Sequence, residues 1–362
     1  MSNVGKFQGA TLYFHSPCFD GIVSCLLAWE FLERNQGWAF SRLLPVNYDR
    51  KGQWLNENLR QPAAVVDYLY HPSAAFWADH HQSTFLTSQA EHNFRERNNG
   101  FLLYDSRADS CSTLLWKRFA NFFVGRKPDH AELVEWASRI DSARYASVEE
   151  AIFGSHPALQ INASLAVSAA DYPERLVRLL RRHSIGEVAA LQDVQSRVSK
   201  ARLLAADGLE RFSQSAQITS DQIVLFDVEC EGVLVHRYAP FYKPSFRDAR
   251  YSVGITRERR VQPEDSEHTQ SSAQDPKEYD KHTKKLVIKA MRNPWREFQS
   301  APLGRIFAGI GGGGHERVGS YIVPAGRASE ATQILEQIVD AIREYERIGE
   351  IRIRPTEITS RV

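Results

Sequence analysis

Four side chains that could bind a metal ion lie close together in the sequence. Asp67 and the triplet Asp79, His80 and His81 each follow a short apolar run. Carboxylate and neutral imidazole are the ligands that manganese, iron, zinc and cobalt share in proteins. The segment therefore suggests a divalent metal site. Adjacent polar residues at a strand end could equally hydrogen-bond a turn, so the rest of the chain must separate these two hypotheses.

The elements around these residues predict an α/β fold. The apolar runs, residues 63–66 and 76–78, have the length and composition of buried strands. Residues 9–14 predict a first strand, and residues 22–34 predict an apolar helix packed against the sheet. A strand, a polar loop and a helix open an α/β unit, and open parallel sheets present functional side chains at the carboxyl ends of their strands. The candidate ligands follow such ends.

More candidate ligands lie at other element boundaries. His15, Cys18 and Asp20 occupy the loop after the first strand, and Asp141 follows a predicted helix at residues 132–140. A lone histidine after a strand most often forms structural hydrogen bonds, and Asp141 could be a solvated helix end. Two converging loops with carboxylates favour a metal site instead, because clustered carboxylates repel one another unless a cation joins them.

Length and composition describe an ordinary globular protein. The 362 residues exceed the usual size of one core, so we expect two domains. The chain is 43% hydrophobic and 25% charged, and its net charge of +1 argues against a protein that coats long nucleic acid. Its four scattered cysteines form no CxxC pair. Without an apolar run of about 20 residues or a signal peptide, a cytoplasmic protein that does not enter membranes is expected.

The remaining chain predicts a helical middle and a second α/β region. A helix is expected at residues 112–124, an arginine-rich helical connector at 172–214, and a helix at 329–346. Strands are expected at residues 101–104, 222–227, 233–238, 250–255 and 286–291. Residues 256–285 contain almost no aliphatic side chains and predict a mobile loop. The connector arginines, Arg175, Arg178, Arg181 and Arg182, fit a solvated face or a phosphate-binding surface.

A glycine run near the end of the chain suggests an anion site. Gly312, Gly313 and Gly314 belong to four consecutive glycines, and His315 and Arg317 follow them. Glycines permit close backbone approach, and exposed N–H groups in such a loop can hold an anion. Glycine loops are also often simple turns.

Taken together, these motifs resemble those of the DHH/DHHA1 phosphoesterase family. The loop HSPCFDG, the Asp67 strand end, the triplet Asp79-His80-His81, Asp141 and the segment GGGGHERVGS match its motifs in order. The family includes RecJ-type exonucleases, nanoRNases, phosphoadenosine phosphate phosphatases and cyclic-dinucleotide phosphodiesterases. The resemblance implies a DHH catalytic domain with a parallel sheet flanked by helices at residues 1–170, a connector at 171–218, a smaller α/β DHHA1 domain at 219–348 and a tail at 349–362.

The resemblance also implies a ligand set for two Mn²⁺ ions. His15 and Asp67 would hold one ion, and Asp20, Asp67, His80 and Asp141 would hold the other, so that Asp67 bridges them. His81 would face the substrate phosphate or support the ligands, and Asp79 would orient the histidines.

A second group of residues would then bind substrate. It comprises Arg292, at the end of the strand at 286–291, and the amides and side chains of Gly312, Gly313, Gly314, His315 and Arg317.

One position departs from the family pattern. Cys18 stands where the first motif commonly has an acidic residue. A thiolate there would favour a softer ion or leave the first site weak.

The predicted function is hydrolysis of phosphodiester or phosphomonoester bonds in short oligonucleotides or small nucleotides by two-metal water activation, with a homodimer as a further possibility. The alternative is a nucleotide-binding regulatory protein whose catalysis Cys18 has weakened. A type II inorganic pyrophosphatase fits less well, because its carboxy-terminal domain lacks a GGGH signature.

Overall fold

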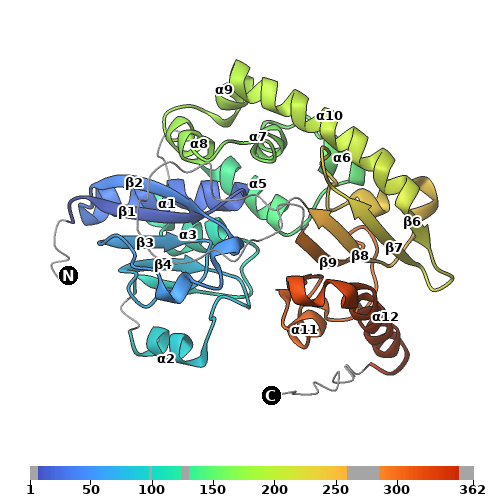
Figure 1. Ribbon diagram of the computed structural model, residues 1–362. Helices are drawn as coiled ribbons and strands as arrows, with labels where there is room; N and C mark the ends of the chain where they lie inside the picture. Colours follow the sequence, from blue (N-terminus) through green and yellow to red (C-terminus); the bar gives the residue numbers. More distant parts are fainter. Residues whose placement is uncertain (1–6, 98–99, 124–129, 259–284, 350–362) are drawn as a thin grey trace, which may run out of the picture. The chain divides into compact units, whose positions relative to one another are not determined.

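The computed structural model describes residues 7–97, 100–123, 130–258 and 285–349. The chain forms two compact units, Met1–Leu203 and Leu204–Val362 (Figure 1). The boundary falls inside the long helix α10 (Gln192–Ser215), within the segment predicted as a helical connector. Each unit contains its own β-sheet.

The first unit is built on a five-stranded sheet in the order β2-β1-β3-β4-β5, and every neighbouring pair in it is parallel. This confirms the predicted parallel sheet. The sequence analysis missed β2. The strands are β1 (Ala10–His15), β2 (Phe40–Val46), β3 (Ala63–Val66), β4 (Phe76–Asp79) and β5 (Leu102–Tyr104).

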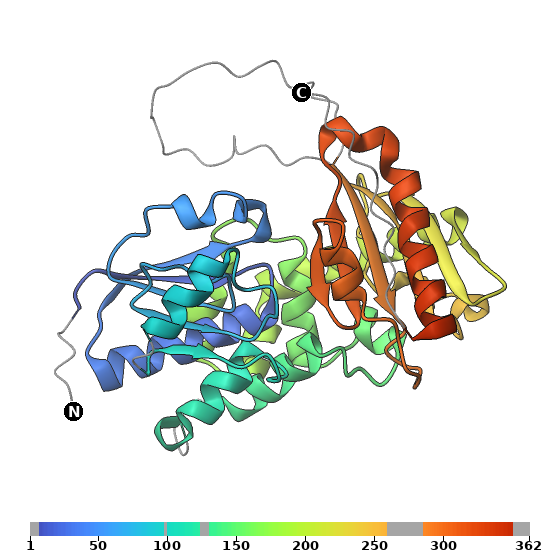
Figure 2. The same cartoon turned by 90° about the horizontal axis from the view of Figure 1, so that it is seen from below.

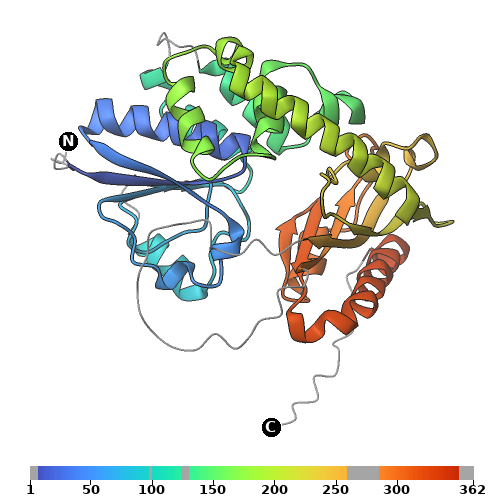
Figure 3. The ribbon, with the colours of Figure 1, turned by 45° about the horizontal axis from the view of Figure 1, so that its top comes forward.

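Helices lie on both sides of this sheet, as Figures 1 and 3 show for α1 and α2. Helix α1 is buried at every residue from Phe19 to Leu32, which explains its continuous apolar sequence. It packs against β1 and against α3, α5 and α8. The helices are α1 (Phe19–Gln36), α2 (Ser88–Glu96), α3 (Cys111–Arg118), α4 (Ala120–Phe123), α5 (Ala131–Asp141), α6 (Val148–Phe153), α7 (Pro157–Leu165), α8 (Tyr172–Leu180) and α9 (Ile185–Ala190).

The second unit has a mixed six-stranded sheet in the order β10-β11-β9-β8-β7-β6. Only β7 and β8 pair in parallel. Figure 2 shows α12 (Ala331–Ile348) lying along this sheet, and its buried aliphatic side chains join the core with those of β8 and β9. The other elements are β6 (Ala216–Ile218), β7 (Ile223–Glu229), β8 (Tyr251–Glu258), β9 (Lys285–Arg292), α11 (Leu303–Ala308), β10 (Gly313–His315) and β11 (Val318–Ile322).

Three local predictions need correction. The strand expected at residues 233–238 is absent from this described segment, because the amide of Leu234 donates to the carbonyl of Leu204 in α10 and not to a neighbouring strand. The helix expected at 112–124 is divided into α3 and α4, and Val124 lies outside the described residues. The polar segment at 256–285 is shorter than expected, since β8 continues to Glu258 and β9 begins at Lys285, while its interior lies outside the described residues.

Within the described parts of the chain, none of the helices combines the length and the apolar character needed to cross a membrane.

Candidate metal centre

The parallel sheet brings three of the predicted motifs to one edge. His15 ends β1, Asp67 follows β3, and Asp79 ends β4 directly before His80 and His81. The register Phe14 to Val66 and Val66 to Ala78 aligns these strand ends side by side. Asp67 adopts a left-handed backbone conformation with φ of 55°, which is uncommon outside glycine, and residues held in it cluster at functional sites.

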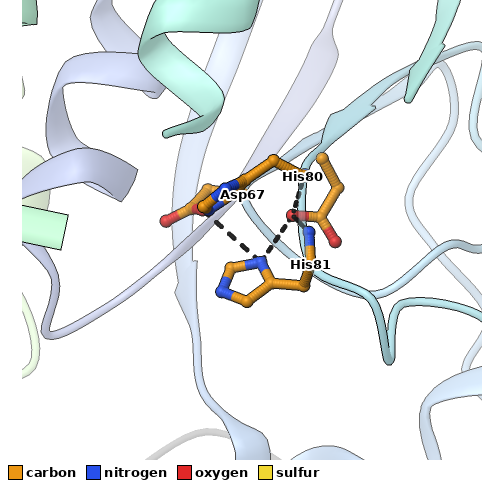
Figure 4. Close-up of side chains that lie close together, drawn as sticks. Asp67, His80 and His81 are labelled. Carbon is orange, nitrogen blue, oxygen red and sulfur yellow. Dashed lines mark hydrogen bonds and ion pairs between the residues drawn. The ribbon is translucent and has the colours of Figure 1, made fainter. Parts of the chain in front are cut away.

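Asp67 lies at the centre of the cluster and is 1% exposed. Its Oδ2 lies 3.5 Å from Nδ1 of His15, and its Oδ1 lies 3.8 Å from Nε2 of His80 and 3.9 Å from Nδ1 of His81 (Figure 4). Neither oxygen of Asp67 accepts a hydrogen bond from the described residues. A buried carboxylate without donors is costly, so this position requires a cation or a proton.

Helix α1 brings Asp20 into the cluster. Asp20 lies in the first turn of α1 and is fully buried. A close approach of α1 to β1 is needed for this, and Gly21 permits it, because a Cβ there would lie 2.0 Å from the carbonyl oxygen of His15. Oδ2 and Oδ1 of Asp20 accept hydrogen bonds from the amides of Cys111 and Ser112 at 2.8 and 3.1 Å, at the amino-terminal end of α3.

Asp141 is the last residue of α5 and approaches the cluster from another side. Its Oδ2 lies 3.2 Å from Nε2 of His80. The other ring nitrogen of His80, Nδ1, lies 3.1 Å from the carbonyl oxygen of Ala108. If Nδ1 donates to this carbonyl, Nε2 can bind a metal as neutral imidazole.

Asp79 supports the two histidines that follow it. Its Oδ1 accepts from the amide of His80 at 2.8 Å and lies 2.7 Å from Nδ1 of His81. Burial disfavours its charge, but the charge of His81 and the hydrogen bond to it outweigh burial and lower the pKa of Asp79. Asp79 therefore holds the ring of His81 in one orientation.

The electrostatics of the cluster fit a cation. Burial, together with the charges of Asp20 and Asp141, raises the pKa of Asp67 well above its usual value. Burial and the charge of Asp141 also raise the pKa of Asp20. Burial lowers the pKa of His15 to about 4, so this imidazole is neutral at pH 7 and does not offset the charge of Asp67. Three carboxylates that repel one another, beside the imidazoles of His15 and His80, form a suitable ligand set for divalent ions.

Among the residues that the structure describes, three groups of side chains have ligand atoms within 4.8 Å of one another. The first contains His15, Cys18 and Asp67, the second contains Asp20, His80 and Asp141, and the third joins Asp67 to Asp79, His80 and His81. All eight candidate metal-site and catalytic residues therefore lie in one cluster of the first unit.

An aromatic residue that sequence reasoning missed borders this cluster. The ring of Tyr48, in the 3-10 helix η1 (Tyr48–Arg50), lies 4.9 Å from the ring of His15 and 6.3 Å from that of His81. Tyr48 follows β2, so recognition of that strand would have placed it at the same sheet edge.

The candidate substrate residues lie around β9, β10 and β11 of the second unit. The amide of Arg292 donates to the carbonyl of Arg317. Burial lowers the pKa of the Arg292 guanidinium, and the charge of Arg317 lowers it further. Arg292 is 8% exposed, and its guanidinium donates to the carbonyls of Arg296 and Phe298. These bonds use Nη2 of Arg292, whereas its buried Nε has no hydrogen-bond partner among the described residues, and Arg317 is exposed.

The glycine run has a packing role. The amide of Gly312 donates to the carbonyl of Phe307, so it is already used within the chain. Gly313, Gly314 and His315 form β10 and pair with β11. A Cβ at Gly314 would lie 2.2 Å from the carbonyl oxygen of Val318, and this explains the need for glycine there.

Comparison with solved structures identifies the fold. One similar structure is the pGpG-specific phosphodiesterase PggH from Vibrio cholerae, at 16% identity and a TM-score of 0.59, covering 91% of this chain and 99% of that chain. Another is RecJ in complex with Mn²⁺ from Thermus thermophilus, at 12% identity and a TM-score of 0.52, covering 97% of this chain and 54% of that chain. No family model and no curated protein matches the sequence. The chain has the fold of the DHH-type phosphoesterases that its motifs resemble, as predicted.

Proposed function

We propose that this protein is a metal-dependent phosphoesterase that hydrolyses short oligonucleotides or small nucleotides. The observation that carries the proposal is Asp67, whose two buried carboxylate oxygens lack a hydrogen-bond donor among the described residues and lie near the imidazoles of His15 and His80. A divalent cation would offset this charge and use the same oxygens as ligands. The fold shared with a pGpG-specific phosphodiesterase supports a nucleotide substrate.

The ligand groups suggest a division of roles. His15 and Asp67, with Cys18 beside them, would hold one ion, while Asp20, Asp67, His80 and Asp141 would hold a second. Bound divalent ions, with Mn²⁺ as the expected metal, would lower the pKa of a water molecule and offset the charge on the phosphate oxygens.

The neighbouring side chains would orient these ligands and the substrate. Asp79 holds the ring of His81 through Nδ1, so that His81 would contact the phosphate through its other ring nitrogen. The amides of Cys111 and Ser112 keep Asp20 in one orientation. Arg317, exposed beside β10, would bind a substrate phosphate remote from the bond that is broken, together with His315.

The alternative is a nucleotide-binding protein with the same fold and weak catalysis, favoured by Cys18 in the first ligand group. One experiment separates the two functions. Protein stripped of metal with EDTA is assayed with Mn²⁺ on bis-p-nitrophenyl phosphate and on the linear dinucleotide pGpG. The proposal expects Mn²⁺-dependent turnover of both. Binding of the dinucleotide without turnover of either compound would support the regulatory alternative.

A further inference from the structure

A second cationic feature lies in the first unit, apart from the metal-ligand cluster. A cavity of about 370 Å³ is lined by Trp29 and by four arginines, Arg34, Arg178, Arg181 and Arg182. Trp29 and Arg34 belong to the last part of α1, and the other three arginines lie at the end of α8, which packs against α1. Figure 3 shows these two helices in the first unit.

Carboxylates neutralise only part of this charge. Arg178 pairs with Glu174, and Arg181 pairs with Glu33. Arg34 and Arg182 form no salt bridge with a carboxylate among the residues that the structure describes, although the charge of Arg34 contributes to lowering the pKa of Glu30, which pairs with His130. The carboxyl ends of the two helices contribute about half a negative charge each, which favours arginines there but does not balance all four. Two of the four guanidinium groups in the cavity therefore form no salt bridge and keep donors for an anion.

Trp29 holds two of the guanidinium groups in place. The centre of the Arg181 guanidinium lies 4.0 Å from the indole ring centroid, and that of Arg178 lies 5.3 Å from it. Trp29 is 7% exposed, so arginines and packing cover its ring. The cavity thus offers N–H donors in fixed positions and little aromatic surface for a base to stack on.

We propose that this cavity binds an oligophosphate group, such as inorganic tripolyphosphate or the phosphate chain of a nucleotide. Guanidinium groups match phosphate oxygens with paired hydrogen bonds, and several phosphates can engage several arginines at once. Because the ring of Trp29 is covered, the cavity would bind the phosphates of a nucleotide and not its base.

The site is separate from the candidate metal centre. Asp20 and Arg34 lie on the same helix, and their separation of 14 positions corresponds to about 21 Å along its axis. A tripolyphosphate bound at Arg34 would therefore not contact the metal ligands. The proposal does not rest on the proposed phosphoesterase activity.

Isothermal titration calorimetry of the full chain tests this site. The protein is kept in EDTA, so that metal-bridged binding at Asp67 is excluded, and is titrated with tripolyphosphate. We expect one binding event that weakens at least tenfold in the double variant Arg34→Gln/Arg182→Gln. Both residues are exposed, so this variant should fold, and its melting temperature checks that. The control variant is Arg347→Gln, which removes an exposed arginine from the last turn of α12 and should leave binding unchanged.

Two further titrations distinguish the source of the phosphates. ATP should bind about as tightly as tripolyphosphate, and adenosine should not bind, because only the phosphate chain is recognised. The proposal is overturned if wild-type protein does not bind tripolyphosphate at millimolar concentration, if the double variant binds as wild type does, or if adenosine binds as tightly as ATP.

Discussion

Oδ2 of Asp20 lies 2.8 Å from the backbone nitrogen of Cys111, the first residue of α3 and 91 positions further along the chain. The amino-terminal end of a helix favours a carboxylate, yet burial and the charge of Asp141 still raise the pKa of Asp20. The backbone therefore orients Asp20 without fully offsetting its charge. A carboxylate that is held in place but keeps its charge is suited to bind a cation.

Gly21→Ala should disturb the metal centre through the backbone. The new Cβ would lie 2.0 Å from the carbonyl oxygen of His15 and 3.2 Å from Oδ2 of Asp67, so α1 must move away from β1. We expect a loss of about 1–3 kcal/mol in the free energy of unfolding and a weaker affinity for Mn²⁺. Gly186→Ala is the matched control, because it also lies in a helix but has no atom within 4 Å of the new Cβ. Equal stability of both variants in urea unfolding would contradict the prediction.

Metal-free protein should lose stability as the pH rises above neutrality. Burial opposes the charge of His80, but the hydrogen bond and charge of Asp141 outweigh it and raise the pKa to about 10. Because His80 binds its proton more tightly in the folded chain than in the unfolded chain, protonation stabilises the fold. This stabilisation is complete below pH 6.5 and is lost as the pH approaches 10. The raised pKa values of Asp67 and Asp20 act in the same direction.

The melting temperature measured in EDTA should therefore fall by about 5 °C or more between pH 6.5 and 9, and Mn²⁺ should remove most of this fall. The pKa of His15, lowered to about 4, affects stability only below this window. A melting temperature that is independent of pH in EDTA would show that the carboxylates do not repel one another in one buried site.

Cys18→Asp should improve the first ligand group for manganese. Burial and the charge of Asp67 raise the pKa of the Cys18 thiol, so the metal-free chain keeps it protonated. Aspartate supplies a hard oxygen ligand, and it also suits the amino-terminal cap of α1, where Cys18 forms no capping hydrogen bond. We expect Mn²⁺ to bind more tightly and turnover to be preserved or raised, whereas Cys18→Ser should not improve binding. Loss of both metal and activity in Cys18→Asp would instead identify the thiolate as a required ligand.

Arg292 and Arg317 should affect different properties. Arg292→Ala removes hydrogen bonds to the carbonyls of Arg296 and Phe298 and should cost about 2 kcal/mol of stability. Arg317→Ala alters an exposed side chain and should leave the melting temperature unchanged. It should lower kcat/KM for pGpG roughly tenfold or more, but not for bis-p-nitrophenyl phosphate, which has no second phosphate. Equal losses on both substrates would exclude Arg317 from substrate selection.

Much of the first unit could be predicted because its signals are local. Residues 63–66 and 76–78 are short apolar runs, each followed by a candidate ligand, and parallel pairing brings such ends to one edge. The strand β2 was missed because its sequence FSRLLPV contains exposed polar residues and a proline, as an edge strand permits. With it, the position of Tyr48 was missed.

Other features depend on contacts between distant residues. The amides of Cys111 and Ser112 beside Asp20 could not be read from either segment alone. The run VLVHRY at residues 233–238 has the composition of a strand, but Leu234 bonds to α10, where Gly208 allows a close approach. The use of the Arg292 guanidinium by backbone carbonyls is equally a tertiary feature.

The central claim is that Asp67 is shared by two divalent ions, and counting bound manganese tests it most directly. Equilibrium dialysis of the wild-type chain against Mn²⁺ should give two ions per chain, and Asp67→Asn should give at most one. Asp105→Asn, which alters an aspartate that also follows a strand but stands outside the ligand groups, should still give two. If Asp67→Asn binds two ions with wild-type affinity, Asp67 is not a shared ligand and the proposed metal centre is wrong.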